Sequence, residues 1–331
     1  MPATISVALC TYNGARFVGA QLSSILDQSR TPDELIVSDD GSFDDTVAVV
    51  EETIRIHAAQ SDGRAPVYVA HVNDRPLGVT RNFERTVTAC TGTLVALSDQ
   101  DDVWHRDRLE RLVREFDEDP GLLLLHTDAR LVDEQGAPLG MTLFEALEIT
   151  AGDRALELSG GGFDALLRRN LATGATVIFR RELLEQALPF PAEWVHDEWL
   201  AIIAAATGRI TVVPEPTIDY RQHGANQIGV RAPTLRHKVR RVLESRSDRN
   251  AALARKFMVL ADRLDELGDA VTAEDRQKVR RKAEFEAFRD ALPTRRWRRI
   301  RAVLRADRAD LYTRFASRGR ADVIRDLLQP A

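Results

Sequence analysis

The first 132 residues alternate short apolar runs with amphipathic segments, and this alternation constrains the fold more than any other feature of the chain. The runs "ISVALC" (5–10), "ELIVSDD" (34–40) and "TLVALSD" (93–99) are typical of buried strands. Between the first two, "RFVGAQLSSILDQ" (16–28) places its apolar side chains on one face of a helix. A repeated strand–helix–strand pattern predicts an α/β fold with a mostly parallel sheet and helices on both of its faces.

The same patterns continue to about residue 230 and then change. Further strands are expected at 66–72, 121–132, 175–181 and 209–216, and further helices at 43–58, 79–90, 106–119, 182–187 and 196–208. The Gly-rich segment 150–171 is expected to be flexible and to enter a helix. The pattern after residue 231 is helical. We therefore expect two domains, an α/β domain over 1–230 and a helical extension over 231–331.

Charge separates the same two domains. Residues 231–331 carry 27 Lys and Arg against 15 Asp and Glu, although the whole chain has 46 and 51 and a net charge of −5. Three basic stretches of the extension (236–246, 276–285 and 294–305) include apolar residues. They suit an anionic membrane surface. They also suit a helical cap that packs on the acidic domain or on a second subunit, with solvated arginines, and the acidic residues interleaved with the basic ones favour this interpretation. No nucleic-acid-binding module is recognisable, so nucleic acid is not an expected partner.

The chain is expected to be cytoplasmic, or peripheral at the inner face of the plasma membrane. Its two cysteines, Cys10 and Cys90, each end an apolar or small-residue run and predict small buried side chains in a reducing compartment. The N-terminus lacks the basic region of a signal peptide. No apolar stretch approaches the roughly 20 residues that cross a bilayer.

Polar clusters follow three of the expected strands. They are "TYNG" (11–14), "SDDGS" (38–42) and "SDQDD" (98–102). The carboxyl ends of parallel strands meet at one edge of a sheet, where ligands bind. The three clusters therefore predict a single cleft.

The cluster at 98–102 concentrates carboxylates. Asp99 and Asp101 are one residue apart and can hold a divalent cation through oxygen, leaving positions for phosphate ligands. Such a cation offsets the charge that develops on a departing nucleotide diphosphate. The alternative is a solvated acidic turn, and the spacing alone does not decide between them.

The other two clusters suit a nucleobase. Asp39 or Asp40 could accept a hydrogen bond from a pyrimidine imide N–H, while Tyr12 could lie against the base. A plain turn at Asn13-Gly14 is the competing interpretation.

Two later segments add candidates. His196, Asp197 and Glu198 precede an apolar helix, where one carboxylate could act as general base for an alcohol or simply cap the helix. Arg221 and His223 offer a phosphate clamp and a metal ligand.

These segments together resemble a known family. "ISVALCTYNGARF", "ELIVSDDGSFDDT" and "LVALSDQDDVWHRDRLERL" resemble the family-two glycosyltransferases with the GT-A fold. "NLATGATVIFRRELL" and "HDEWLAIIAAATG" are similar to the bacterial branch described as rhamnosyltransferase-like. The resemblance covers about residues 4–230. Ala175 stands where relatives often have Cys, so no particular acceptor is implied.

The resemblance implies roles for individual residues. Asp99 and Asp101 would form the DxD motif, with Asp101 on the metal and Asp99 on the ribose or the metal. Asp197 would be the catalytic base and His223 a late ligand of the metal or the diphosphate. The other implied positions are Thr11, Tyr12, Asn13, Asp39, Asp40, Arg81 and Arg221 for the nucleotide, and Trp104, Gly174, His196, Glu198 and Trp199 for the sugar and acceptor pocket.

The implied activity is metal-dependent, inverting glycosyl transfer. With Mg²⁺ or Mn²⁺, a sugar would move from a UDP- or dTDP-sugar, dTDP-rhamnose among them, to a hydroxyl of a glycan or lipid-linked acceptor in cell-wall or polysaccharide synthesis. Two alternatives stay open. A nucleotidyltransferase would usually carry a Gly-rich basic loop after the first strand, and a nucleotide-binding scaffold would show no turnover.

Overall fold

The computed structural model describes residues 3–60, 65–224 and 249–329. The chain divides into two compact units, of which the first comprises residues 1–160 and 172–230 and the second residues 161–171 and 231–331. The predicted domains were continuous in sequence, whereas the helical unit also includes the short segment 161–171. The basic stretch 236–246 lies outside the described residues.

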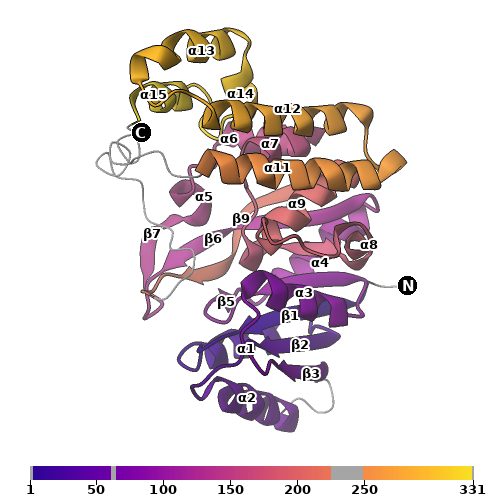
Figure 1. The fold of residues 1–331 in the computed structure, drawn as a ribbon. Helices are drawn as coiled ribbons and strands as arrows, with labels where there is room; N and C mark the ends of the chain where they lie inside the picture. Colours follow the sequence, from indigo (N-terminus) through magenta and orange to yellow (C-terminus); the bar gives the residue numbers. More distant parts are fainter. Residues whose placement is uncertain (1–2, 61–64, 225–248, 330–331) are drawn as a thin grey trace. The chain divides into compact units, whose positions relative to one another are not determined.

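The first unit is built on a nine-stranded sheet, with β3 at one edge (Figure 1). The strands are β1 (Ile5–Thr11), β2 (Glu34–Asp39), β3 (Val67–Val72), β4 (Leu94–Ser98), β5 (Val103–Trp104), β6 (Leu122–Val132), β7 (Pro138–Thr142), β8 (Ile178–Arg180) and β9 (Arg209–Arg221). Their order is β3-β2-β1-β4-β8-β6-β9-β5, and β7 pairs with β6. Strands β1 to β4, β6 and β9 share one direction, and β5, β7 and β8 run against it. The prediction of a mostly parallel α/β sheet is confirmed.

The helices of this unit cover both faces of the sheet. They are α1 (Val18–Leu26), α2 (Thr46–Gln60), α3 (Val79–Ala89), α4 (Arg108–Glu118), α5 (Leu143–Ala146), α6 (Ala151–Leu156), α8 (Leu184–Ala187) and α9 (His196–Thr207). The chain passes from β1 through β2 to β3, with α1 packed on α2, and α3 then returns it to β4 on the other side of β1. Because crossovers are right-handed, this reversal puts α3 on the opposite face, where it packs against α9. Ligands bind beyond the carboxyl ends of strands at such a reversal, which here lies between β1 and β4.

Burial explains why the central strands were predictable. Nearly every residue of β1, β2 and β4 is buried, so each reads as a continuous apolar run that ends where the polar loop begins. Cys10 and Cys90 are free, and burial raises the pKa of Cys90 to about 12. Both therefore contribute packing.

Strand β9 is longer than the sequence pattern suggested. It continues to Arg221, past Pro216, because β6 supplies partners as far as the pair Val132 and Arg221. Pro216 lies at a register shift, where the missing backbone N–H is tolerated. The Gly-rich segment enters a helix as predicted, α7 (Gly162–Arg168), and the turn Glu157–Gly161 between α6 and α7 is kinked at Gly160, whose φ is 88°.

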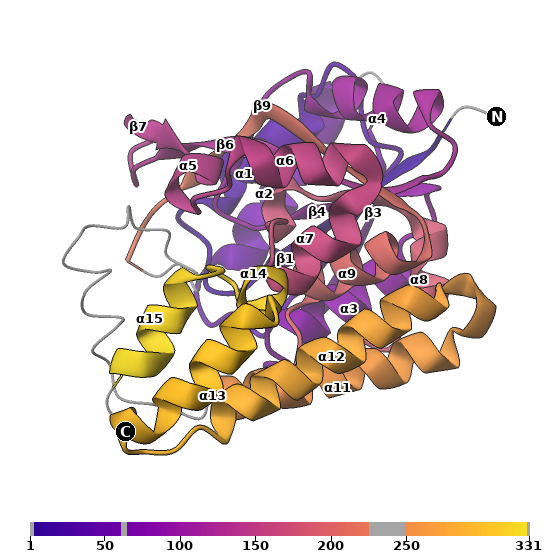
Figure 2. The same cartoon turned by 90° about the horizontal axis from the view of Figure 1, so that it is seen from above.

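The second unit is helical. Besides α7 it contains α11 (Arg249–Glu266), α12 (Ala273–Asp290), α13 (Arg296–Arg308), α14 (Leu311–Phe315) and α15 (Ala321–Leu328). Helices α11 and α12 lie side by side, and α13 packs against α14 and α15 (Figure 2). Among the described helices, none combines the length and the apolar composition that spanning a bilayer requires.

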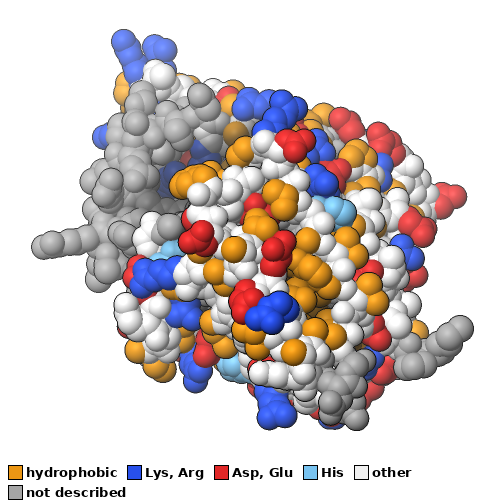
Figure 3. Space-filling view, turned by 90° about the horizontal axis from the view of Figure 1, so that it is seen from below, with side chains coloured by type: hydrophobic (Ala, Val, Ile, Leu, Met, Phe, Trp, Pro, Cys, Tyr) orange, Lys and Arg blue, Asp and Glu red, His pale blue; other side chains and the backbone are white. Residues whose placement is uncertain are grey.

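The surface at the β3 and α2 end of the first unit is mixed. In Figure 3, acidic and basic side chains are interspersed with apolar ones on this face. Such a surface is typical of an ordinary globular domain.

Candidate active site

The loops after β1 and β4 are joined by one side chain. Gln100 Oε1 accepts a hydrogen bond from the backbone N–H of Tyr12 at 2.8 Å, and Gln100 Nε2 donates to the Tyr12 carbonyl at 3.0 Å. The amide of Gln100 occupies the space in which a side chain at Gly14 would lie. The sequence pattern indicated no role for Gln100 and only a turn at Gly14. The position of Gln100 between two aspartates was the signal that could have indicated it.

The loop after β2 is fastened to the loop after β1. Asp39 accepts hydrogen bonds from Thr11 Oγ1 at 2.7 Å and from the backbone N–H and hydroxyl of Ser42 at 2.8 and 2.6 Å. Asn13 has a positive φ of 49°, and its Oδ1 accepts a bond from the Phe43 N–H at 3.0 Å. Three predicted nucleotide residues are thus brought together with fixed orientations.

Asp40 and Arg81 have other partners. Asp40 accepts bonds from the backbone N–H groups of Leu77 at 2.7 Å and Gly78 at 2.9 Å. It therefore braces the loop in front of α3. Arg81 extends from α3 and pairs with Glu84, and half of its side chain is exposed.

Of the carboxylates after β4, Asp102 is buried and Asp99 and Asp101 are partly exposed. Burial first, and then the charges of Asp101 and Asp197, raise the pKa of Asp99 to about 7. His223 Nε2 lies 2.7 Å from Asp101 Oδ2, and the imidazole stacks on Phe17 with ring centroids 4.7 Å apart. His223 thus contacts Asp101, and the charges of Asp101 and Asp197 act on Asp99; these four residues are called the acidic cluster below.

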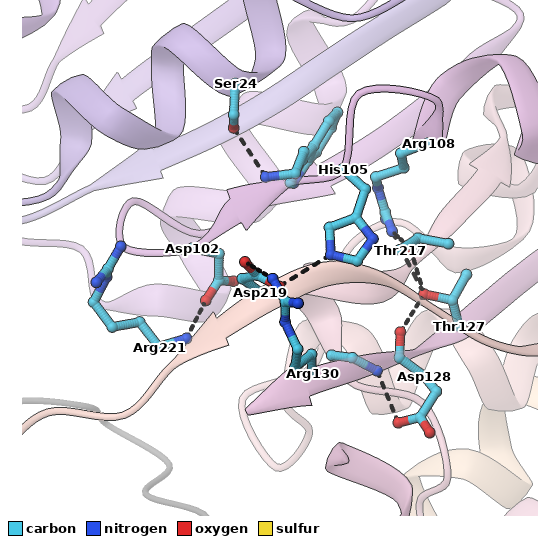
Figure 4. A network of polar contacts seen from close by, with 12 residues as sticks. Ser24, Asp102, His105, Arg108, Thr127, Asp128, Arg130, Thr217, Asp219 and Arg221 are labelled. Carbon is cyan, nitrogen blue, oxygen red and sulfur yellow. Dashed lines mark hydrogen bonds and ion pairs between the residues drawn. The ribbon is translucent and has the colours of Figure 1, made fainter. Parts of the chain in front are cut away.

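Arg221 makes hydrogen bonds to the loop that carries Asp101 and Asp102. Its backbone N–H donates to Asp102 Oδ1 at 3.0 Å (Figure 4), and its Nε donates to the Asp101 carbonyl at 2.8 Å. Its Nη1 donates to the Glu134 carbonyl at 2.8 Å. These contacts hold the backbone of the acidic loop, whereas the sequence predicted a nucleotide contact.

Strand β9 carries further polar groups toward the segment after β4 (Figure 4). Asp219 receives two hydrogen bonds from Arg130, at 2.8 and 2.6 Å, and lies 3.0 Å from His105 Nε2. Arg108 donates to Thr217, and burial lowers the pKa of Arg108 to about 9. The network fixes the backbone on which the acidic loop rests.

Asp197 lies in the first turn of α9 and is held by backbone groups. Its Oδ2 accepts a hydrogen bond from the Gly174 N–H at 2.8 Å, and its Oδ1 accepts one from the Glu198 N–H at 2.7 Å. A Cβ at Gly174 would lie 3.0 Å from His196 Nε2 and 3.5 Å from Asp197 Oδ2. Glycine therefore lets the start of α9 approach this loop closely.

His196 is buried and neutral. Its ring stacks on Phe83 at a centroid distance of 3.9 Å and an angle of 16°. Burial lowers its pKa to about 3. Among the described residues, neither ring nitrogen has a hydrogen-bond partner.

The two tryptophans predicted for the sugar and acceptor pocket belong to the core. Trp104 is 3% exposed and lies under the Arg108 guanidinium, 4.8 Å from the ring centroid. Trp199 is 1% exposed and its Nε1 donates to the Ala187 carbonyl at 2.7 Å. Rings so deeply buried have almost no face to offer a sugar, so the structure gives them a packing role in place of the predicted one.

Comparisons with known proteins agree on one family. The model of glycosyl transferase family 2 matches residues 6–185. An uncharacterized glycosyltransferase of Nostoc is 27% identical over 234 residues, which are 67% of this chain and 66% of that protein. The dTDP-rhamnosyl transferase RfbG of Shigella flexneri is 23% identical, over 67% of this chain and 73% of the other.

A solved structure supports the fold. The mannosyltransferase PcManGT of Pyrobaculum calidifontis, solved with GDP-Man and Mn²⁺, superposes with a TM-score of 0.53 and 20% identity, over 98% of this chain and 86% of the other. The match spans 59% to 66% of the length of the first curated relatives.

Proposed function

The chain belongs to glycosyl transferase family 2 and is a glycosyltransferase with the GT-A fold, and we propose that it performs metal-dependent, inverting transfer from a pyrimidine nucleotide-sugar. The family match favours this enzyme class over the nucleotidyltransferase considered from the sequence. The observation that carries the proposal is the cluster of Asp99, Asp101, Asp197 and His223 at the reversal between β1 and β4.

The donor set fits a divalent cation. Asp101 and His223 bring a carboxylate and an imidazole into contact, and Asp99 adds a partly buried carboxylate whose pKa is raised first by burial and then by the charges of Asp101 and Asp197. Among the described residues, no group of three or more His, Cys, Asp or Glu side chains is arranged to hold a metal ion. The proposed site would therefore supply two protein ligands, Asp101 and His223, and leave positions on Mg²⁺ or Mn²⁺ open for the diphosphate. Such a cation, when bound, would neutralise charge on the leaving diphosphate.

Asp197 is the proposed general base. It would accept the proton of the acceptor hydroxyl while the new bond to the anomeric carbon forms and the bond to the diphosphate oxygen breaks. The N–H groups of Gly174 and Glu198 hold its two oxygens, so the carboxylate is oriented before an acceptor arrives. Attack from the side opposite the diphosphate would invert the anomeric centre.

The donor is proposed to be a UDP- or dTDP-sugar, with dTDP-rhamnose as the first candidate. Asp39 is fixed by Thr11 and Ser42 and would accept the imide N–H that uracil and thymine share. Tyr12, 42% exposed, would lie against the base. The similarity to the dTDP-rhamnosyl transferase RfbG supports the sugar. The acceptor is proposed to be a hydroxyl of a glycan or lipid-linked sugar in the cytoplasm or at the inner membrane face.

A thermal-shift panel tests the function. UDP, dTDP, GDP and their sugars are compared with and without Mn²⁺, in the wild type, in Asp101→Asn and in the control Asp107→Asn, whose side chain is 56% exposed. A ligand that binds only the folded state raises the melting temperature. We expect Mn²⁺-dependent stabilisation by UDP or dTDP compounds that is lost in Asp101→Asn alone. Stabilisation by GDP compounds only would overturn the pyrimidine donor, and no shift with any nucleotide would overturn the proposal.

A further inference from the structure

One face of helix α13 is buried in the interior of the helical unit. Its buried residues are Arg299, Val303 and Ala306, which recur at intervals of four and three and so lie on one side of the helix. Arg299 donates to the carbonyls of Asp326 at 3.1 Å and Gln329 at 2.9 Å. The orientation of α13 within its unit is therefore fixed.

The outward side carries an apolar stripe. Trp297, Ile300 and Leu304 are 64%, 45% and 41% exposed and are also spaced by three and four residues. Single exposed apolar residues are common on proteins, but three aligned on one helix face, with a tryptophan among them, are not accounted for by packing against the described residues.

A second stripe, of arginines, runs beside the first. Arg298, Arg301, Arg305 and Arg308 are exposed and follow the apolar positions by one residue or one turn. In the described part of the chain, no carboxylate pairs with any of these four arginines, although Arg314 and Arg320 of the same unit have partners at 3.3 and 3.5 Å. The guanidinium of Arg298 lies 5.0 Å from the Trp297 ring centroid. The positive charge of this stripe is therefore not compensated by carboxylates of the described residues and is available to a binding partner.

We propose that the outward face of α13 binds the surface of an anionic lipid bilayer. Trp297, Ile300 and Leu304 would enter the boundary between headgroups and acyl chains, where a tryptophan gains from an apolar body and a polar N–H. The adjacent arginines would contact lipid phosphates, and their long side chains would reach the headgroup level. A stripe of apolar groups next to a stripe of one charge sign is the arrangement that lies in the plane of a membrane.

Charge argues against two other occupants. A second copy docked through the same face would bring the two arginine stripes together and cost electrostatic energy. Residues 225–248 of this chain carry six Lys and Arg against two Asp and Glu, so this segment also lacks the charge that the stripe calls for. An anionic bilayer offers both the negative charge and the apolar layer.

The test is co-sedimentation of the full chain with vesicles at low salt. Vesicles of phosphatidylcholine and phosphatidylglycerol in equal parts are compared with phosphatidylcholine alone. Each exposed basic residue near a charged surface contributes a factor of about five in affinity. The variant Arg298→Gln/Arg301→Gln/Arg305→Gln should therefore bind on the order of 100-fold more weakly, and Trp297→Ser/Leu304→Ser should also lose most binding.

Matched controls keep the result specific. Arg55→Gln/Arg114→Gln/Arg209→Gln removes the same charge from exposed positions elsewhere, and Met258→Ser removes an apolar side chain that is 50% exposed. Both should bind like the wild type. Of the four tryptophans only Trp297 is exposed, so quenching by brominated lipids should report its insertion, and circular dichroism confirms that each variant is folded.

Three results would overturn the proposal. They are failure of the wild type to bind anionic vesicles, equal binding to phosphatidylcholine alone, and equal losses in the controls and the α13 variants. Self-association of the wild type that the α13 variants abolish, without vesicle binding, would assign the face to a second copy instead.

Discussion

Gln100 and Tyr12 form a closed pair in which the side-chain amide of one meets the backbone N–H and carbonyl of the other, at 2.8 and 3.0 Å. The pair ties the loop after β4, which carries Asp99 and Asp101 of the acidic cluster, to the loop after β1, which carries the proposed base contacts. The two halves of the proposed nucleotide site therefore have a fixed separation.

Gly14→Ala should break this pair. The added Cβ would occupy the place of the Gln100 amide, so the side chain must leave and the two hydrogen bonds are lost. Losing bonds worth about 1 kcal/mol each should weaken nucleotide binding about 10-fold or more. Calorimetric titration with UDP measures the loss. Gly152→Ala, where a Cβ meets its nearest neighbour at an ordinary 3.5 Å, is the control and should bind as the wild type does.

Asp197→Asn should separate chemistry from binding. If Asp197 removes the acceptor proton, its loss should lower kcat by about 10²–10⁴. The affinity for the donor should change much less than kcat, because the amide keeps the size of the side chain and loses only one of the two backbone N–H bonds that Asp197 accepts. Steady-state kinetics with the donor identified by thermal shift gives both values. Glu198→Gln, one residue further along α9, is the comparison, and equal losses in the two variants would argue against a specific base.

The sequence allowed the sheet and the meeting of the loops at its edge to be predicted because their signals are local. Strands β1, β2 and β4 are buried on both faces, so each apolar run ends at the residue where the loop begins. Once the strands are parallel and adjacent, the loops after them must meet. The prediction of a single cleft followed from this rule, whereas the roles of Asp99 and Asp101 were implied by the family resemblance.

The supporting contacts could not be predicted because they depend on distant partners. Arg221 follows a strand and precedes His223, as a phosphate-binding arginine would, yet its donors reach the backbone of Asp101 and Glu134, which are 120 and 87 residues away. The burial of Trp104 likewise results from the stack with Arg108 and from the core around it. Residue type and spacing in the sequence do not indicate such contacts.

The unfolding free energy should fall as the pH falls from about 6.5 toward 3, in part through His196. Its pKa is about 3 when folded, against 6.5 when exposed, because burial disfavours the charged ring. Between these values the unfolded chain binds a proton that the folded chain does not, so stability rises with pH in this window. At 1.36 kcal/mol per pH unit, the full effect approaches about 5 kcal/mol.

His196→Phe isolates this contribution. A phenyl ring retains the stack on Phe83 but cannot be protonated. Denaturant melts of both proteins at pH 7, 5.5 and 4 should show a wild-type stability that declines more steeply. Parallel curves would mean that His196 is hydrated, or protonated when folded.

The helical unit should depend on a buried ion pair. Arg289 makes two hydrogen bonds to Asp326, at 2.8 and 3.0 Å, and Tyr312 donates to the same carboxylate at 2.7 Å. Asp326→Ala removes the carboxylate that accepts two of the hydrogen bonds of the buried Arg289 guanidinium and leaves it with Glu286 at 3.2 Å, so the unfolding free energy should fall by about 3 kcal/mol, the low end for a broken buried pair. Tyr312→Phe removes a single hydrogen bond and should cost about 1 kcal/mol.

A double variant distinguishes two causes of the lost stability: the free energy of burying an incompletely paired charge, and the free energy of the hydrogen bonds that are removed. Arg289→Met/Asp326→Leu removes both charges and should recover much of the stability that Asp326→Ala loses, because apolar replacements of a buried pair are often close to neutral. Denaturant melts followed by circular dichroism measure all three variants. A double variant as unstable as Asp326→Ala would contradict this. The stability of the unit would then depend on the hydrogen bonds of Arg289 and Asp326 themselves, including those to Glu286 and Tyr312, which connect α12 with α14 and α15.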